Sequence, residues 1–177
     1  MLAQARKNLS VRGIEATLVK ADFRELDRHF SDWFDAVVCL STSLPHLLAE
    51  SEVLEMLENT RKVLRPEGLL VITQAITDKL VRDKPFFIPV ITRHNFSRIF
   101  GVEYGIQTLK FHVLDLVHTA GRQQSTEYCF EYQIVLRDDY QRLLEATGYQ
   151  SIEFFSDYGR TPYDKETSDR MIVVASG

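Results

Sequence analysis

The stretch from 34 to 75 constrains the fold more than any other part of the sequence. Two apolar, valine-rich runs, FDAVVCLS at 34–41 and LLVITQA at 69–75, predict strands that are buried on both faces of a sheet. Between them, residues 51–64 place leucines at helical spacing, and the RPEG that follows predicts a turn. A strand, a helix and a second strand in this order predict a βαβ unit with parallel strands and a right-handed crossover.

Shorter patterns precede this unit. Residues 3–9 predict a helix that ends at Gly13, because glycine is the residue that most often closes a helix. ATLVKAD, at 16–22, predicts a short strand with an aspartate at its end. An acid at the end of an apolar strand is unusual, and we treat it as a candidate functional residue.

The chain changes character between residues 79 and 136. KPFFIPVITRHNFSRIF, at 84–100, is aromatic and irregular, whereas 105–119 and 125–136 alternate apolar and polar residues on either side of AGRQQ. This alternation predicts an antiparallel hairpin with one face covered. The aromatic side chains of the segment either form a lid over an organic substrate or make up the core of the small sheet. Seven of them lie here: Phe86, Phe87, Phe96, Phe100, Tyr104, Tyr128 and Tyr132.

The last part of the chain predicts a helix and two strands. Residues 138–147 form the helix, with Asp138 as its N-cap and Gln141 three residues later, as in a capping box. QSIEFFSDY, at 150–158, and RMIVVAS, at 170–176, predict the strands, with a polar loop between them.

Composition restricts the class of protein. With 177 residues and 45% apolar content, the chain is long enough for one domain with its own core. A net charge of -4 argues against nucleic acid as the main partner, and the apolar runs are far shorter than a membrane span. Cys39 and Cys129 both lie in apolar runs, so we expect two buried, reduced thiols and a cytoplasmic location.

Four further residues were considered as ligand-binding groups. His112 and His118 share a face of a predicted strand, about 20 Å apart at about 3.3 Å per residue, so we expect structural histidines and no metal site. Arg93 and Arg98 either grip a substrate carboxylate as a fork or are solvated.

Five segments in a fixed order resemble the class I S-adenosylmethionine-dependent methyltransferases. They are MLAQARKNL, VKADFREL, FDAVVCLSTSLPHLL, LENTRKVLRPEGLLVI and LLEATGYQSIEFF. CLSTSLPHLL is also similar to a loop of the glycine and sarcosine N-methyltransferases, which carry asparagine where this chain has Thr42. The resemblance implies an α/β, Rossmann-like, mostly parallel sheet that lacks its first two strands, with an antiparallel β insertion and an antiparallel last strand.

The resemblance also implies a set of cofactor-binding residues. Asp22 would accept a hydrogen bond from the adenine amine while Phe23 packs on the ring; from the pattern alone, Asp22 instead caps the turn that follows. Leu40 and Ser41 would face S-adenosylmethionine with their backbone. His46 would contact the cofactor's carboxylate or the substrate, or accept a proton as the candidate catalytic residue. The alternative interpretation of His46 is a loop histidine with backbone partners.

Two elements of the family pattern are missing from the sequence. None of the eight glycines forms the GxGxG turn, and the acidic ribose-binding strand has no counterpart. We therefore expect one of three outcomes: residues 1–30 are loosely held, a second copy covers the open sheet edge, or Met1 is an internal methionine of an N-terminally truncated protein. We favour the last.

The predicted function is methyl transfer from S-adenosylmethionine to a small-molecule N or O acceptor, impaired here because the glycine-rich turn is absent. The single domain would comprise a partial cofactor-binding half (1–78), an insertion or substrate lid (79–136) and a C-terminal helix with two strands (137–177). The alternative is a non-catalytic methyltransferase remnant that acts as a dimerising or partner-binding module, including a homodimer. A fragment of another nucleotide-binding α/β protein, such as a dehydrogenase, is less favoured because of the late hairpin.

Overall fold

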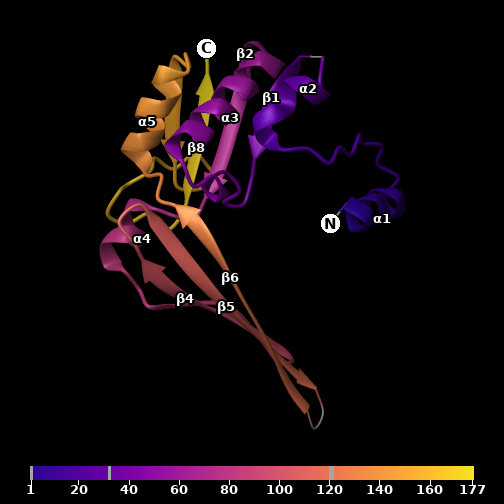
Figure 1. Ribbon diagram of the computed structural model, residues 1–177, viewed down its shortest axis with the longest axis vertical. Helices are drawn as coiled ribbons and strands as arrows, with labels where there is room; N and C mark the ends of the chain where they lie inside the picture. Colours follow the sequence, from indigo (N-terminus) through magenta and orange to yellow (C-terminus); the bar gives the residue numbers. More distant parts are fainter. Residues whose placement is uncertain (1, 32, 120–121) are drawn as a thin grey trace.

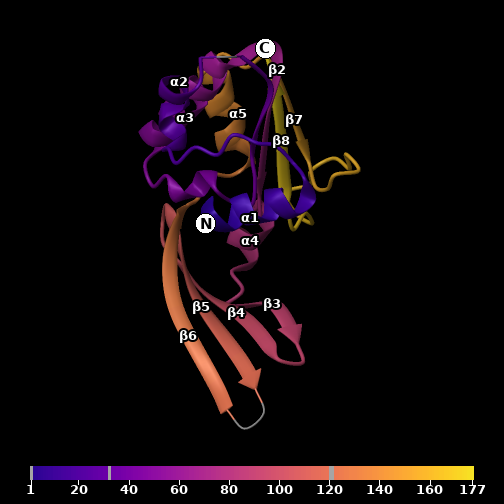
Figure 2. The same ribbon diagram turned by 90° about the vertical axis from the view of Figure 1, so that its right-hand side faces the viewer.

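The protein is an α/β fold built from two four-stranded sheets (Figure 1). The computed structural model describes residues 2–31, 33–119 and 122–177. Sheet A has the strand order β1-β2-β8-β7, and sheet B the order β3-β4-β5-β6. Sheet B extends away from the end of sheet A (Figures 1 and 2). No helix among the described residues is long and apolar enough to cross a membrane.

The predicted βαβ unit is confirmed in sheet A. Strand β1 (Phe34–Cys39) pairs in parallel with β2 (Leu64–Gln74), and helix α3 (Glu50–Val63) connects them. The two C-terminal strands, β7 (Ser151–Phe155) and β8 (Met171–Ser176), are also confirmed. Strand β8 pairs antiparallel with both β2 and β7, which confirms the predicted antiparallel last strand. The prediction of a mostly parallel sheet is nevertheless wrong, because sheet A is mixed. After β7 the chain turns back, and β8 lies between β7 and β2.

Helix α5 (Arg137–Ala146) confirms the predicted late helix but begins differently. Its N-cap is Leu136, whose backbone N–H donates to the Asp139 carboxylate at 3.0 Å. Asp138 instead accepts a hydrogen bond from the guanidinium of Arg137. The prediction that Asp138 caps the helix is therefore wrong, because the helix starts one residue earlier and Asp139 is then the side chain that reaches the cap.

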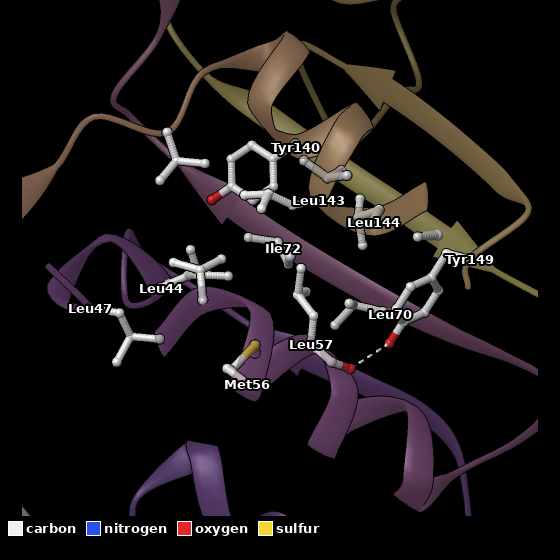
Figure 3. Close-up of a cluster of buried hydrophobic side chains, with 14 of the residues drawn as sticks. Leu44, Leu47, Met56, Leu57, Leu70, Ile72, Tyr140, Leu143, Leu144 and Tyr149 are labelled. Carbon is white, nitrogen blue, oxygen red and sulfur yellow. Dashed lines mark hydrogen bonds between the residues drawn. The ribbon is translucent and has the colours of Figure 1, made fainter. Parts of the chain in front are cut away.

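Helices α3 and α5 pack on the same face of sheet A and form the main core (Figures 2 and 3). Leu70 and Ile72 of β2 point into this core and are 0% and 1% exposed. Tyr149 donates from its hydroxyl to the carbonyl of Leu57 at 3.5 Å, as Figure 3 shows. Hydrophobic burial between helices and sheet is the main stabilising contribution here.

The other face of sheet A is more open than predicted. Val38 of β1 is 54% exposed and Leu69 of β2 is 43% exposed. The prediction that these strands are buried on both faces is wrong, because in the described residues the long helices α3 and α5 cover one face of this edge.

The segment before β1 also differs from the prediction. Residues 14–22 contain no strand, so the predicted strand at 16–22 is wrong. Within the described residues β1 pairs with β2 and forms the edge of sheet A, and a strand without a hydrogen-bonded neighbour is not stable by itself. Helix α1 (Leu2–Arg12) confirms the predicted first helix, but it has no buried residues and lies apart from sheet A (Figure 1).

Two short helices connect this segment to sheet A. They are η1 (Phe23–Glu25) and α2 (Leu26–His29). Arg24 of η1 forms an ion pair with Glu52 of α3, and Lys62 of α3 pairs with Asp27 at 3.0 Å. Both helices are therefore held against α3, in contrast to α1.

Sheet B is fully antiparallel. The hairpin predicted from alternation is confirmed as β5 (Thr108–Thr119) and β6 (Arg122–Gln133), and residues 120–121 of the predicted AGRQQ turn lie outside the described residues. Strands β3 (Phe87–Arg93) and β4 (Phe96–Tyr104) were predicted to be irregular, and that prediction is wrong. A register shift next to Pro89 interrupts the alternation that would have revealed β3.

The two cysteines occupy different environments. Both are free; Cys39 is half-buried, whereas Cys129 is exposed on β6. Burial raises the pKa of the Cys39 thiol. The prediction of two buried thiols is therefore wrong for Cys129, which lies on the outward face of sheet B.

Candidate functional site

The loop that follows β1 is fastened to the end of β2. Ser41 and Thr42 both have a φ of 61°, a left-handed conformation that is uncommon for residues other than glycine and concentrates at functional sites. Their backbone N–H groups donate to the hydroxyl and the carbonyl of Thr73, each at 2.9 Å. The Ala75 N–H donates to the Thr42 hydroxyl at 3.1 Å. We call these tied strand ends, residues 40–43 and 73–75, the ledge.

The next turn, η2 (Leu44–His46), joins the ledge to sheet B. Leu44 and Leu47 are 0% and 6% exposed and anchor the turn in the main core (Figure 3). His46 points away from this core, and its ring centroid lies 4.5 Å from that of Tyr132 and 6.0 Å from that of Phe130. His46 therefore has aromatic neighbours on β6, whereas the alternative considered for it was a loop histidine with backbone partners.

The buried side-chain amide of Gln74 forms hydrogen bonds close to the place where the ledge meets sheet B. Gln74, 2% exposed, donates from its side chain to the carbonyls of Ile76 at 2.6 Å and Val135 at 2.8 Å. Its side-chain oxygen accepts from the Tyr140 hydroxyl at 2.7 Å, and burial raises the Tyr140 pKa well above its usual value. Sequence reasoning missed this network, although a glutamine at the end of an apolar strand was its visible signal. The network therefore fixes the position of the ledge relative to the segment that follows β6, at Val135.

A pocket of about 590 Å³ lies between the ledge and sheet B. Helix α4 (Asp78–Asp83) borders it, with Thr77 as N-cap. The Tyr163 hydroxyl donates to the Asp78 carboxylate at 2.8 Å and ties α4 to the loop after β7. Six of the lining residues are Ser41, Thr42, Ile76, Phe100, Phe130 and Tyr132. The pocket therefore opens at the carboxyl ends of the parallel strands β1 and β2, where open α/β sheets bind ligands.

The predicted aromatic residues occupy different environments, and their role as a lid over a substrate stays a prediction. Phe100, Tyr104 and Tyr132 pack against the small core of sheet B, and Phe100 and Tyr132 also line the pocket. Phe86 and Phe87, in contrast, are 65% and 64% exposed. A larger hollow of about 790 Å³ on sheet B includes Phe87 but does not reach the strand ends of sheet A. We therefore take the smaller pocket as the candidate site.

Asp22 acts as the cap that its local pattern predicted. Its carboxylate accepts from the Arg24 backbone N–H at 2.9 Å and from the Arg24 guanidinium at 3.0 and 2.8 Å. These hydrogen bonds lower the Asp22 pKa to about 2. Phe23 is half-buried and packs against the main core. The contacts of Asp22 and Phe23 with adenine stay predictions, and Arg24 would have to share the carboxylate with the adenine amine.

Two of the other candidate groups have protein partners. Arg98 forms a two-pronged ion pair with Asp115, with both N–O distances 2.6 Å, so it is neither solvated nor free to grip a carboxylate. His112 lies 2.9 Å from the Glu103 carboxylate. Within the described residues no group of histidines, cysteines and acids is arranged to hold a metal ion.

The residues fit part of the predicted cofactor. The ledge lies at the strand ends where Leu40 and Ser41 were predicted to meet S-adenosylmethionine, and Leu40 is 48% exposed, although the N–H groups of Ser41 and Thr42 are already bonded to Thr73. None of the eight glycines in the chain forms the glycine-rich turn that would hold the methionine part. Contact of Leu40 and Ser41 with the cofactor therefore stays a prediction.

Comparisons with known proteins point to one family. A family profile described as "Methyltransferase domain" matches residues 1–68. The glycine/sarcosine N-methyltransferases of Aphanothece halophytica and Halorhodospira halochloris are 28% and 29% identical to 99% of this chain. The chain spans 63% of the length of each of these relatives.

Solved structures show the same fold. An S-adenosylmethionine-dependent methyltransferase from Clostridium acetobutylicum superposes with a TM-score of 0.85 at 11% identity, over 99% of this chain and 70% of that one. An amino pentose methyltransferase from Micromonospora echinaspora has a TM-score of 0.69 at 18% identity, over 89% and 63%. The chain is thus similar in sequence to the glycine/sarcosine N-methyltransferases over 99% of its length, and it has the fold of S-adenosylmethionine-dependent methyltransferases.

Proposed function

We propose that this chain forms the acceptor-binding side of an N-methyltransferase site that acts on a small-molecule amine. The observation that carries the proposal is the pocket between the ledge and sheet B, which opens where β1 and β2 end. When bound, S-adenosylmethionine supplies an already activated methyl group. The protein then has to hold the amine in line with that group and exclude water.

The proposed roles follow from position. The backbone of Leu40 and Ser41 faces the cofactor across the ledge, and Asp22 with Phe23 contacts its adenine. His46, exposed and in contact with the ring of Tyr132, lies beside the pocket and accepts a proton from an acceptor amine that arrives protonated. An amine must lose that proton before its lone pair can attack the methyl group.

Calorimetric titration of the chain with S-adenosylhomocysteine, the product form of the cofactor, tests the proposal. We expect weak but saturable binding, because the chain supplies the ledge without a glycine-rich turn. Asp22→Asn should reduce the affinity further, whereas Asp35→Asn, at an exposed position on β1, serves as the matched control. A millimolar dissociation constant corresponds to a binding free energy of about -4 kcal/mol. If no heat is measured at millimolar ligand, that result would contradict cofactor binding by this chain.

The outer edge of β1 favours a second candidate function, that of a dimerising or partner-binding module without catalysis. Val38 and Trp33 are 54% and 62% exposed beside this edge, and exposed apolar edge strands tend to pair with another chain. Sedimentation velocity at several concentrations tests it. A dimer that Val38→Lys dissociates would support this function, and a monomer at all concentrations would argue against self-association.

A further inference from the structure

We infer that the pocket accepts an amine carried on a ring and without a carboxylate, in preference to glycine or sarcosine. The inference rests on the proposed function, because it names the substrate class of the same site. Three features of the pocket lead to it: its size, its aromatic wall and its charges.

The size of the pocket exceeds what a small amino acid needs. Its volume of about 590 Å³ lies within the range of roughly 300–1,000 Å³ that holds drug-sized ligands. Glycine has only a handful of non-hydrogen atoms and fills the space of a few water molecules, each about 30 Å³. A glycine bound at the ledge would leave most of the apolar surface wet, so a larger molecule gains more from the same pocket.

Sheet B presents a preformed aromatic wall to this pocket. Phe111 and Phe130 stack with their centroids 5.7 Å apart and their planes 15° apart, and Tyr132 packs on Phe130 at 4.9 Å. Phe100 closes the group edge-on to Phe111 at 5.6 Å. These side chains hold one another in place, and flat rings of this kind bind ring faces and cationic amines. The wall therefore favours an acceptor that has a ring.

The charges at the pocket do not suit a carboxylate. Three charged side chains are among the described lining residues, Lys79, Asp83 and Asp169, and Asp83 is paired with the guanidinium of Arg82 at 2.8 Å. Lys79 is already paired with Asp169 at 2.8 Å. Carboxylates are held best by an arginine fork, and the lining residues include no arginine. An amine is thus better matched to this pocket than an amino acid's carboxylate.

The test compares probes by NMR titration of the ¹⁵N-labelled chain. Cyclohexylamine and glucosamine represent apolar and hydroxylated ring amines, cyclohexanecarboxylate is the ring without the amine, and glycine and sarcosine are the small acceptors. We expect at least one ring amine to bind at least about tenfold more tightly than glycine, sarcosine and the ring acid. Its largest shifts should fall on the amides of 75–77 and 130–132.

Matched variants locate the binding. Tyr132→Leu should weaken the ring amine roughly three- to tenfold by removing part of the wall. Tyr128→Leu, four residues away on β6 and outside this pocket, should leave the affinity unchanged. Lys79→Met removes the lysine of the lining and tests whether a carboxylate is held there, and Phe130→Leu, at another residue of the wall, serves if Tyr132→Leu fails to fold.

The outcomes separate this inference from the proposed function. Tighter binding of glycine or sarcosine, above all if Lys79→Met abolishes it, would overturn the ring-amine inference. Absence of binding by both ring amines would also overturn it, while S-adenosylhomocysteine binding by the same sample would leave the proposed function standing. If neither the amines nor S-adenosylhomocysteine binds, both are overturned.

Discussion

The imidazole of His46 lies against the ring of Tyr132, with 4.5 Å between the ring centroids, and this contact joins the loop after β1 to sheet B. His46 comes from the turn that continues the ledge, and Tyr132 comes from the wall of the pocket. The two halves of the site, separated by more than eighty residues in the sequence, thus meet at this contact.

Replacement of His46 tests whether this contact matters for stability. His46→Ala should lower the free energy of unfolding by roughly 0.5–1.5 kcal/mol, the usual contribution of such an aromatic pair. Urea denaturation measures the change. His29→Ala, at an exposed position in α2, is the control and should have less effect; an equal loss in both variants would argue against a specific contact.

The buried hydrogen bond between Tyr140 and Gln74 should be more costly to remove. Tyr140→Phe leaves the Gln74 side-chain oxygen buried without its donor, and we expect a loss of about 1–3 kcal/mol in thermal or urea unfolding. Tyr158→Phe removes a hydroxyl from a side chain that is 71% exposed and should be near neutral. Similar values for both variants would contradict the assigned role of the network.

The ion pair of Asp22 with Arg24 predicts a specific pH dependence. In the folded protein the pKa of Asp22 is about 2, which is below its usual value. The ion pair therefore makes its full contribution to stability at pH values above the usual pKa of an aspartate. It is lost as the pH falls towards 2. The pair is partly exposed, so we expect less than about 1 kcal/mol.

NMR titration of the Asp22 carboxyl group measures its pKa directly, as the midpoint of the titration curve. Arg24→Ala should return the Asp22 midpoint towards its usual value of about 3.9, while Arg28→Ala, on an exposed part of α2, should not. A midpoint that is unchanged by Arg24→Ala would show that Arg24 does not cause the shift.

The two cysteines should react at different rates with a thiol reagent. Cys129 is exposed and should react fast, whereas Cys39 is half-buried and its raised pKa leaves less thiolate to react. Absorbance kinetics with a disulfide reagent should show one fast and one slow phase. Cys129→Ser should remove the fast phase; loss of the slow phase instead would reverse the assignment.

Local patterns predicted the parts of the fold that depend on neighbours in sequence. The apolar runs of β1 and β2 and the leucines of α3 sufficed for the βαβ unit. The open face around Val38 depends on which elements pack beside a strand, and periodicity does not contain that information. The antiparallel last strand, β8, was predicted through the family resemblance and not from periodicity. Strand β3 could not be predicted from alternation, because its register shifts next to Pro89.

The candidate site was predicted in part. The stretch from Leu40 to His46 was identified through its resemblance to the methyltransferase family, and the structure shows it tied to β2 and packed on sheet B. The pocket as a whole could not be predicted, because its wall comes from β4, β5 and β6, and their pairing brings Phe100, Phe111 and Phe130 together only in the folded chain.

The measurement that tests the central claim most directly is amide NMR of the chain during titration with S-adenosylhomocysteine. The account predicts that shifts concentrate on the ledge and the following turn, residues 40–46 and 73–75, with smaller shifts around Asp22. Shifts confined to the outer hollow of sheet B, around Gly101 and Cys129, or no shifts at saturating ligand, would contradict the claim that the ledge is where this chain meets the cofactor.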